Sequence, residues 1–275
     1  MRGIDISQHN GKINFDKVKK NVDFIILRLG WIGNKENHTL DTRFNEYYNE
    51  CKRYGIPIGI YVYCYSNNIK AAESGAKWTL NQLKDRQIEL PVFIDMEDAS
   101  IRKLGKDKLT NIAIAFNNII QAERRPGVYA NLDWFNNCLH KEILKKYVTW
   151  IAHYGLLNKN KYKGIYDILQ YTSSGKVNGI TGKVDMNEMY GNLIDQNKFK
   201  PGETVKIDMP IAVAYNNGTK SIVDNGESQF WIDNRAIKDN KINAEGIIAY
   251  AADKVYIVQV YSEQFWCKEQ YLKRV

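Results

Sequence analysis

The sequence lacks the features that mark several large classes of protein. No apolar run approaches the ~18–20 residues that a membrane-spanning helix needs, which excludes an integral membrane protein. The N-terminus has no basic segment followed by an apolar core, so we predict no secretory signal and expect synthesis in a cytoplasm. The four cysteines show no Cys-x-x-Cys spacing, which argues against a structural zinc site and a disulfide framework. Neither a dinucleotide-binding glycine fingerprint nor a phosphate-binding loop follows the first predicted strand, which disfavours a nucleotide-binding open sheet.

The composition is that of an ordinary globular protein. Apolar residues make up 44% and charged residues 25% of the 275 positions, which excludes a disordered or fibrous chain. Residues 1–195 carry 28 Lys and Arg against 21 Asp and Glu, whereas the last 80 residues carry 11 against 10. A basic larger part favours an anionic partner such as nucleic acid, lipid headgroups or a wall polymer. Because no nucleic-acid motif or block of like charges accompanies it, a solvated surface rich in Lys is an equal alternative.

Alternating strand and helix patterns predict the fold of the larger part. Helices are predicted at 16–21, 41–54, 69–83 and 106–122. Strands are predicted at 2–7, 23–29, 57–64, 91–97, 127–130, 148–152, 165–171 and 183–186. Repeated strand–helix units imply a parallel sheet, either a barrel or an open sheet. Because no amphipathic helix fits between the last strands, we favour a barrel of five strand–helix units followed by three strands.

A change of pattern predicts a second domain. The polar stretch 195–203 contains a Pro-Gly turn signature, which is typical of a domain boundary. Beyond it, short β-branched and aromatic runs separated by turn residues predict a small β-barrel or sandwich. We therefore expect a barrel domain over residues 1–195, a linker over 196–204 and a mainly-β domain over 205–275.

Strand alternation predicts which side chains face the barrel lumen. The side chains that this parity places in the lumen, toward the C-terminal ends of the first strands, are Asp5, Arg28, Tyr61, Tyr63, Asp95 and Glu97. Those in comparable places on the last three strands are Trp150, Gln170 and Asp185. In barrels of this type the C-terminal end carries the active site, so these residues are the candidate site.

Paired carboxylates beside aromatic side chains suit glycoside chemistry. One carboxyl group must be protonated to donate to the leaving oxygen, and another must be ionised to stabilise positive charge on the sugar. Asp95 beside Glu97 is expected to raise the pKa of Glu97, while Tyr and Trp rings pack against sugars. The residues alone leave open a turn cap or ion pair for a single Asp, and a structural pairing of Arg28 with Asp5 or Asp95. They also leave open a metal site, which the lack of a lumen-facing histidine disfavours.

Several short segments occur together in the order found in one known family. They are 3–7 with 10–11, 24–28, 55–61, 91–97, 150–154, 170–173 and 184–187. With these segments, about the first 190 residues resemble glycoside hydrolase family 25. The sequence Arg28-Leu29-Gly30-Trp31 departs from the Lys-containing version that is common in that family.

The resemblance implies an irregular α/β TIM-like barrel with N-acetylmuramidase (lysozyme) activity. The bond cleaved would be the β-1,4 glycosidic bond between N-acetylmuramic acid and N-acetylglucosamine in peptidoglycan. Glu97 would be the general acid, with Asp95 and Asp185 orienting or stabilising the reacting sugar and Asp5 supporting them. The family is often described as using the acetamido group of the substrate as the nucleophile. The implied cleft-lining, substrate-binding residues are Tyr61, Tyr63, Tyr129, Trp150, Gln170, Tyr171 and Arg28. No metal or cofactor is implied.

The combination of a muramidase pattern with a small β module resembles a bacteriophage endolysin. Residues 265–273 are similar to the last strand and turn of bacterial src-homology-3-like wall-binding domains. We expect peptidoglycan and anionic wall polymers as partners, without nucleic acid binding or membrane insertion, and lysis of Gram-positive walls after release from the host cytoplasm. Two alternatives stay open: a substrate-assisted hydrolase of another N-acetylated polysaccharide such as chitin, and a non-catalytic wall-binding protein.

Overall fold

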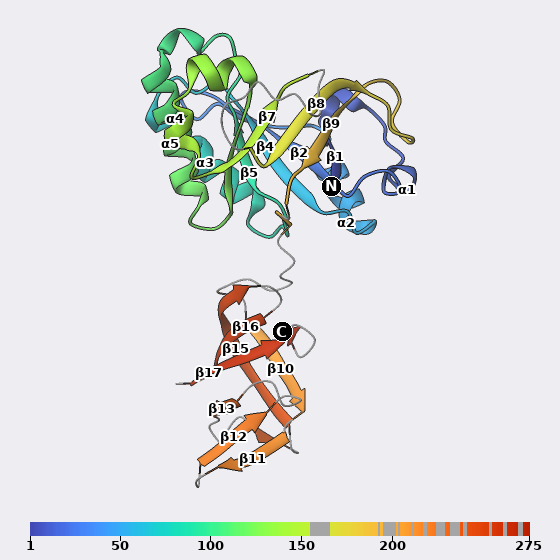
Figure 1. Cartoon of the computed structure of the whole chain (residues 1–275), viewed down its shortest axis with the longest axis vertical. Helices are drawn as coiled ribbons and strands as arrows, with labels where there is room; N and C mark the ends of the chain where they lie inside the picture. Colours follow the sequence, from blue (N-terminus) through green and yellow to red (C-terminus); the bar gives the residue numbers. More distant parts are fainter. Residues whose placement is uncertain are drawn as a thin grey trace. The chain divides into compact units, whose positions relative to one another are not determined.

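The computed structural model of the chain divides into two units, Met1–Ile194 (unit 1) and Asp195–Val275 (unit 2), drawn in Figure 1. The residues described are 1–154, 166–191, 193–194, 202, 204–210, 212–216, 219–223, 229–231, 237–238, 241–252, 255–260, 263–268 and 272–275. In these ranges, no helix combines the length and the apolar character needed to cross a membrane.

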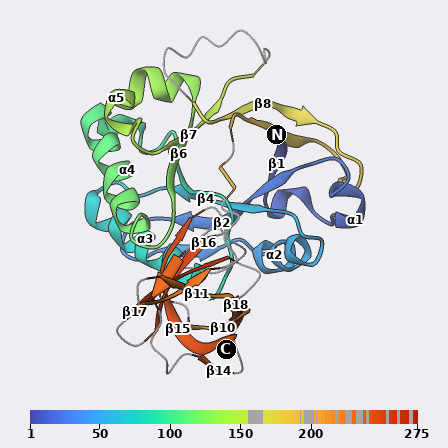
Figure 2. The same cartoon turned by 60° about the horizontal axis from the view of Figure 1, so that its bottom comes forward.

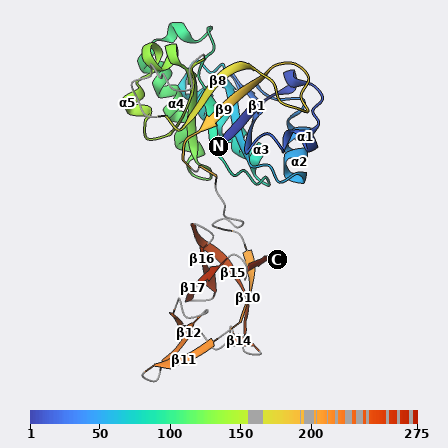
Figure 3. The same ribbon diagram turned by 45° about the vertical axis from the view of Figure 1, so that its right-hand side comes forward.

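A closed barrel of eight strands forms the centre of unit 1. The strands are β1 (Arg2–Ile6), β2 (Phe24–Ile32), β4 (Ile58–Cys64), β5 (Val92–Asp95), β6 (Pro126–Asn131), β7 (Val148–Ala152), β8 (Ile168–Gly175) and β9 (Val184–Met189). They follow the order β1-β9-β8-β7-β6-β5-β4-β2, and pairing of β1 with β2 closes the barrel. Neighbouring strands are parallel except for β9, which lies between β8 and β1 and pairs antiparallel with both. The three strands can be followed in Figure 3. The predicted irregular barrel is confirmed.

Helices cover the outside of the barrel. They are α1 (Phe15–Val18), α2 (Phe44–Arg53), α3 (Ile69–Leu83), α4 (Lys106–Ile120) and α5 (Lys141–Leu144), with the short helical turns η1 (Gln8–Asn10), η2 (Arg102–Leu104) and η3 (Trp134–Cys138). In Figures 1 and 2, α3, α4 and α5 lie on one side of the strands and α1 and α2 on the other. The sequence did not predict η1, η2, η3 or α5, each of which has five residues or fewer.

Two apolar layers stabilise the barrel. Ile60 and Val62 are fully buried and belong to the layer between strands and helices. Phe24, Phe93 and Trp150 belong to a second layer inside the lumen. Each buried side chain of this size removes enough apolar surface from water to stabilise the fold by about 1.5–3 kcal/mol. The lumen is therefore a packed core, and only its C-terminal end is left for chemistry.

Three of the four cysteines lie in buried positions as free thiols. They are Cys51, Cys64 and Cys138. The side chain of Cys267 falls outside the described part of the structure. Burial raises the pKa of the Cys64 thiol to about 12.

A bulge interrupts the regular alternation of β2. Arg28 aligns with Tyr61 of β4, but Gly30 aligns with Val62, so β2 carries one extra residue between the two pairs. Beyond the bulge, the short strand β3 (His38–Leu40) pairs antiparallel with the end of β2. Gly30 has a φ of +156°, and a Cβ there would lie 1.9 Å from the carbonyl oxygen of Thr39. Only glycine therefore allows β3 to approach this closely.

Unit 2 consists of antiparallel strands in its described residues. One sheet contains β10 (Thr204–Pro210), β14 (Ile237–Lys238), β15 (Lys241–Ala252), β16 (Val255–Val260), β17 (Glu263–Lys268) and β18 (Leu272–Arg274). The other contains β11 (Ala212–Asn216), β12 (Thr219–Val223) and β13 (Gln229–Trp231). Val205, Ile207, Tyr256 and Val258 are buried, which gives this unit an apolar core of its own. Its likeness to src-homology-3 domains stays a prediction, and the linker predicted at 196–204 lies largely outside the described residues.

Candidate active site

Strand register brings the four predicted carboxylates together at one end of the barrel. Asp5 of β1 aligns directly with Asp185 of β9. Asp95 is the last residue of β5, and Glu97 follows it by two positions. Asp5 and Asp95 are buried, whereas Glu97 and Asp185 are half-buried. Because β9 is antiparallel to the other strands, its beginning lies where they finish, and we call this the carboxylate end.

Two amides hold the carboxylate of Asp5. Its Oδ1 accepts hydrogen bonds from Nε2 of Gln170 at 2.9 Å and from Nδ2 of Asn187 at 2.7 Å. Asn187 in turn accepts a hydrogen bond on Oδ1 from the indole N–H of Trp150 at 2.8 Å. Since an indole N–H can only donate, it determines which way the Asn187 amide faces. The position of Asp5 is therefore set by strands β7, β8 and β9 together.

Two tyrosine hydroxyls orient Gln170 and connect it to the candidate acid. The hydroxyls of Tyr129 and Tyr154 donate to Oε1 of Gln170 at 3.0 and 2.8 Å. These bonds turn the amide nitrogen of Gln170 toward Asp5. Donation from the same Tyr129 proton toward Glu97 lowers the pKa of Glu97, so Gln170 and Glu97 compete for one donor. Tyr129 thus lies between Glu97 and the Gln170–Asp5 pair.

Burial is the main influence on the charge of the inner carboxyl groups. It raises the pKa of Asp5 to about 8, with repulsion from Asp185 adding to it and the hydrogen bonds from Asn187 and Gln170 opposing it. Burial also raises the pKa of Asp95 well above its usual range, followed by repulsion from Glu97 and Asp5. Both groups therefore favour the neutral form over a wide pH range.

Glu97 also has a raised pKa, for a reason that the sequence only partly predicted. Burial is the largest cause, and repulsion from Asp185 is the second. The sequence pointed instead to Asp95 as the neighbour responsible, but repulsion between Asp95 and Glu97 raises the pKa of Asp95. Burial raises the pKa of Asp185 as well. A carboxylic acid that keeps its proton toward neutral pH can act as a general acid.

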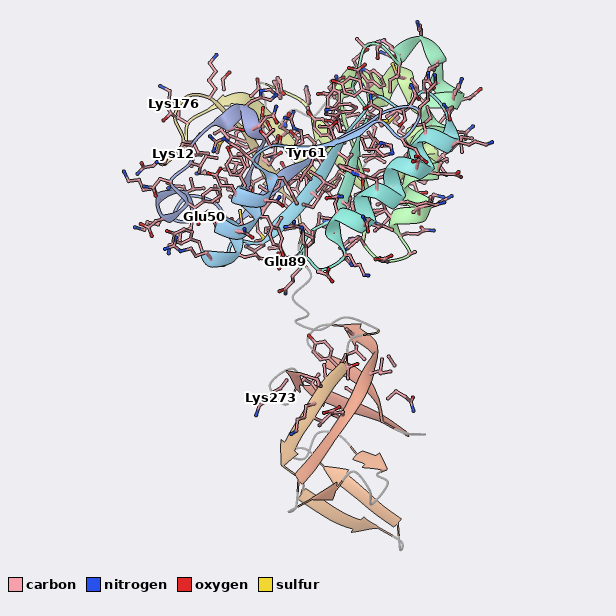
Figure 4. The ribbon with its side chains drawn as sticks, turned by 180° about the vertical axis from the view of Figure 1, so that it is seen from behind. Lys12, Glu50, Tyr61, Glu89, Lys176 and Lys273 are labelled. Atoms are coloured by element: carbon pink, nitrogen blue, oxygen red, sulfur yellow. The ribbon has the colours of Figure 1, made fainter. Side chains whose placement is uncertain are left out.

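Aromatic residues line the lumen beneath and beside the carboxylates. Tyr61 projects among the barrel strands in Figure 4, and its ring meets that of Trp150 edge-on with a centroid separation of 5.9 Å. The ring of Tyr129 packs against Trp150 at 4.3 Å. Tyr63 donates a hydrogen bond from its hydroxyl to Oδ2 of Asp98 at 3.1 Å. The structure therefore places these four predicted residues next to the carboxylates, with Trp150 fully buried.

Arg28 forms an ion pair that the sequence did not predict. Its Nε donates to Oδ2 of Asp41 at 2.7 Å, and the side chain of Asp41 is almost entirely buried. Asp41 also accepts the backbone N–H groups of Gln8 and Arg43, which ties β2 to η1 and to the start of α2. Arg28 thus pairs with neither Asp5 nor Asp95, although its charge opposes the rise in the pKa of Asp95.

Tyr171 is the one predicted site residue that the structure does not bring to the carboxylates. It follows Gln170 in β8, so its side chain lies on the opposite face of the strand. There it packs against the outer apolar layer, and the charges of Arg2 and Glu188 influence its pKa. The alternation that placed Gln170 in the lumen was already a signal against Tyr171.

Some residues of the site were not among the predicted ones. Asn187 lies two positions after Asp185 in β9, so strand alternation could have identified it. Tyr154 and Asp98 lie beyond the ends of their strands, where alternation makes no prediction. Across the described ranges, no three His, Cys, Asp or Glu side chains are grouped as a metal ion would require.

Known proteins resemble this chain over unit 1. A family model described as Glycosyl hydrolases family 25 matches residues 4–180. An autolytic lysozyme from Clostridium acetobutylicum is 27% identical over 210 residues, which are 76% of this chain and 60% of that protein. The modular autolysin LytC from Streptococcus pneumoniae, also solved in complex with a synthetic peptidoglycan ligand, is 31% identical with a TM-score of 0.60; the match covers 69% of this chain and 46% of LytC.

A further solved structure resembles the chain over nearly its whole length. The spore cortex lytic enzyme SleM from Clostridium perfringens has a TM-score of 0.66 and 19% identity, covering 98% of this chain and 87% of SleM. At this identity the likeness concerns the fold. The chain spans less than two thirds of the autolytic lysozyme and of LytC. The family match extends over more than half of the 275 residues and includes Asp5, Asp95 and Glu97, and the chain therefore belongs to glycosyl hydrolases family 25.

Proposed function

We propose that the protein is an N-acetylmuramidase that cleaves the β-1,4 bond between N-acetylmuramic acid and N-acetylglucosamine in peptidoglycan. The observation that carries the proposal is the position of Glu97. This carboxyl group has a raised pKa, lies at the carboxylate end, and is flanked by Asp95 and Asp185. The names of the related lysozyme and the peptidoglycan complex of LytC support the choice of substrate.

In the proposed reaction, Glu97 donates its proton to the glycosidic oxygen as the bond from that oxygen to the sugar C1 breaks. The acetamido oxygen of the same sugar forms a bond to C1 and gives an oxazolinium-like intermediate. Asp95 and Asp185 face this positive charge, which favours their ionised forms and so lowers their pKa values during the reaction. Water then adds to C1 as the bond from C1 to the acetamido oxygen breaks, and it gives a proton back to Glu97, which restores the acid and the acetamido group.

In this proposal, Asp5 acts by positioning neighbouring side chains. Its hydrogen bonds to Gln170 and Asn187 fix the amides beside Glu97 and Asp185. The half-buried Tyr61 and Tyr63 would provide the walls that hold the sugars, while the buried Tyr129 orients Gln170. Trp150 lies beneath these tyrosines and stabilises Tyr61 and Tyr129 through its ring contacts.

The decisive experiment is mass spectrometry of the soluble fragments released from purified Gram-positive peptidoglycan. We expect fragments with N-acetylmuramic acid at the reducing end from the unaltered protein, and a loss of at least about 100-fold in their release with Glu97→Gln. Glu123→Gln, at an exposed position near the beginning of β6, is the matched control and should release them normally. Thermal unfolding of both variants checks that folding is intact.

Each other outcome identifies a different function. Fragments that end in reducing N-acetylglucosamine would contradict the proposed bond and indicate a glucosaminidase. Release of products from chitin oligomers in preference to peptidoglycan would indicate a hydrolase of another N-acetylated polysaccharide. Binding to walls without new reducing ends would indicate a non-catalytic wall-binding protein.

We further propose an endolysin-type organisation, in which residues 1–195 are the catalytic barrel, 196–204 a linker and 205–275 a wall-binding module. The protein would be made in a host cytoplasm and act on the wall after release. A second binding element raises the effective concentration of an enzyme at its polymer. The excess of basic residues in 1–195 would add attraction to anionic wall polymers. Sedimentation with walls, before and after removal of their anionic polymers, tests both ideas.

A further inference from the structure

The bulge in β2 changes which face of the barrel Trp31 occupies. Before the bulge, lumen and outer residues alternate, and continued alternation from Arg28 would direct Trp31 toward the helices. Because the bulge inserts one residue, Trp31 aligns instead with Tyr63 of β4, and aligned residues share a face of the sheet. Ile32 then takes the outer face, where it is fully buried and packs against Gly75 of α3.

Trp31 belongs to a cluster of three aromatic rings beside the carboxylates. Its ring meets that of Tyr65 edge-on at 5.7 Å, and the rings of Tyr65 and Tyr63 are 4.9 Å apart. We call Trp31, Tyr63 and Tyr65 the aromatic platform. Tyr65 is 40% exposed, and Trp31 and Tyr63 are partly exposed, so ring surface is open to a ligand.

The aromatic platform is held in place from both of its strands. The backbone N–H of Tyr65 donates to the carbonyl oxygen of Ile32 at 2.8 Å. The N–H of Asn67 donates to Oδ1 of Asn34 at 3.0 Å, which joins the β2–β3 turn to the segment after β4. Rings that are fixed before binding lose little conformational entropy when a ligand docks on them. The cluster is therefore suited to binding and not only to filling space.

The aromatic platform is continuous with the candidate catalytic residues. Tyr63 aligns with Asp95 across β4 and β5, and its hydroxyl bonds to Asp98, which directly follows Glu97. Asp98 also accepts hydrogen bonds from the backbone N–H and the hydroxyl of Ser100, which fixes the segment after Glu97. The rings therefore lie beside the segment that carries Glu97, on the side of β2 and β4.

We propose that Trp31, Tyr63 and Tyr65 form a binding subsite for a sugar of the glycan strand, separate from the two sugars that flank the cleaved bond. The faces of pyranose rings carry C–H groups that pack on aromatic rings, and the tyrosine hydroxyls offer polar contacts at the edge. The inference rests on the proposed function for the identity of the polymer. It predicts that the protein distinguishes long glycan strands from short ones.

The test measures binding to peptide-free oligosaccharides of alternating N-acetylglucosamine and N-acetylmuramic acid, by calorimetry. The full chain carrying Glu97→Gln is used so that the ligand is not consumed. Trp31→Ala and, separately, Tyr65→Ala are expected to weaken binding of an octasaccharide by about 3- to 10-fold and to leave disaccharide binding unchanged. The matched control is Tyr190→Ala, a tyrosine that is 42% exposed at the opposite end of the barrel.

The outcomes separate this inference from the proposed function. Equal loss of affinity for both lengths, or no loss for the octasaccharide, would overturn the subsite, even where unaltered Glu97 cleaves peptidoglycan as proposed. A length-dependent loss supports the subsite even in a protein that releases no fragments. No binding of any glycan by the Glu97→Gln chain would overturn it. Because Tyr65 is more exposed than Trp31, Tyr65→Ala keeps the test valid where Trp31→Ala reduces folding.

Discussion

At the scale of single residues, the site depends on carboxyl groups whose pKa values are raised by some neighbours and lowered by others. Repulsion from Asp185 raises the pKa of Glu97, whereas the hydrogen bond from Tyr129 lowers it. The proposed acid is active in its protonated form, so activity should fall as the pH rises through the pKa of Glu97. Changes to these two neighbours should therefore move the alkaline limb of the activity profile in opposite directions.

We expect Asp185→Asn to move the alkaline limb to lower pH, because it removes a negative charge that favours the protonated form of Glu97. We expect Tyr129→Phe to move the limb to higher pH, because it removes a hydrogen bond that favours the ionised form. The two shifts are expected to have opposite signs, along with lower rates in both variants. The measurement is kcat/KM for soluble glycan fragments between pH 4 and 9.

A control variant for these measurements is Tyr147→Phe. It removes a hydroxyl that bonds to Asn118, away from the carboxylates, and should leave the profile in place. Shifts of the same sign in Asp185→Asn and Tyr129→Phe would show that Glu97 does not set the alkaline limb.

At the scale of elements, alternation in the sequence predicted the eight barrel strands and the face of most of their side chains. It succeeded at Tyr61 and Asp95 because successive side chains of β4 and β5 alternate regularly between the helix-facing side and the lumen. It missed the role of Trp31, because the register of β2 depends on a bulge and on pairing with β3. It also missed Asp41, whose partner Arg28 lies 13 positions earlier on another element. Such pairings are properties of the folded backbone and leave no local pattern.

The bulge in β2 provides a prediction about stability. A Cβ at position 30 would lie 1.9 Å from the carbonyl oxygen of Thr39, so Gly30→Ala must separate β3 from β2. We expect a loss of about 2–4 kcal/mol in the free energy of unfolding. Gly182→Ala is the matched control, because its φ of +94° is also strained while no atom lies within 4 Å of the added Cβ.

The control should cost only about 1–2 kcal/mol, the strain of a positive φ without a clash. Urea denaturation of the two variants measures the difference. Equal losses would mean that β3 moves away without cost and does not fix the β2 bulge. Weaker binding of long glycans by Gly30→Ala would connect the bulge to the aromatic platform.

At the scale of the whole molecule, each of the two units has its own buried apolar residues. Leu193 is buried in the lumen layer of unit 1, so the unit is completed by the residues just after β9. A chain that ends after Ile194 is therefore expected to fold and to cleave soluble glycan fragments within about twofold of the full chain. Its lysis of intact walls should fall about tenfold or more, because the proposed wall-binding module is lost.

Turbidity of a wall suspension and the release of reducing ends from soluble fragments measure the two activities. A chain that ends at Gly191 is the comparison, since it lacks Leu193 and uncovers the lumen layer. Undiminished wall lysis by the chain that ends at Ile194 would contradict a wall-binding role for unit 2. Failure of that chain to fold would contradict the independence of unit 1.

The reversed direction of β9 has a consequence for how such a chain can be extended. In a barrel of eight parallel strands, the last strand would deliver the chain at the carboxylate end. Here β9 runs the other way, and Met189 aligns with Ile168 at the beginning of β8. The last barrel strand therefore ends at the end of the barrel opposite the carboxylates. Gene fusions at this junction can exchange one appended module for another without altering a single residue around Glu97.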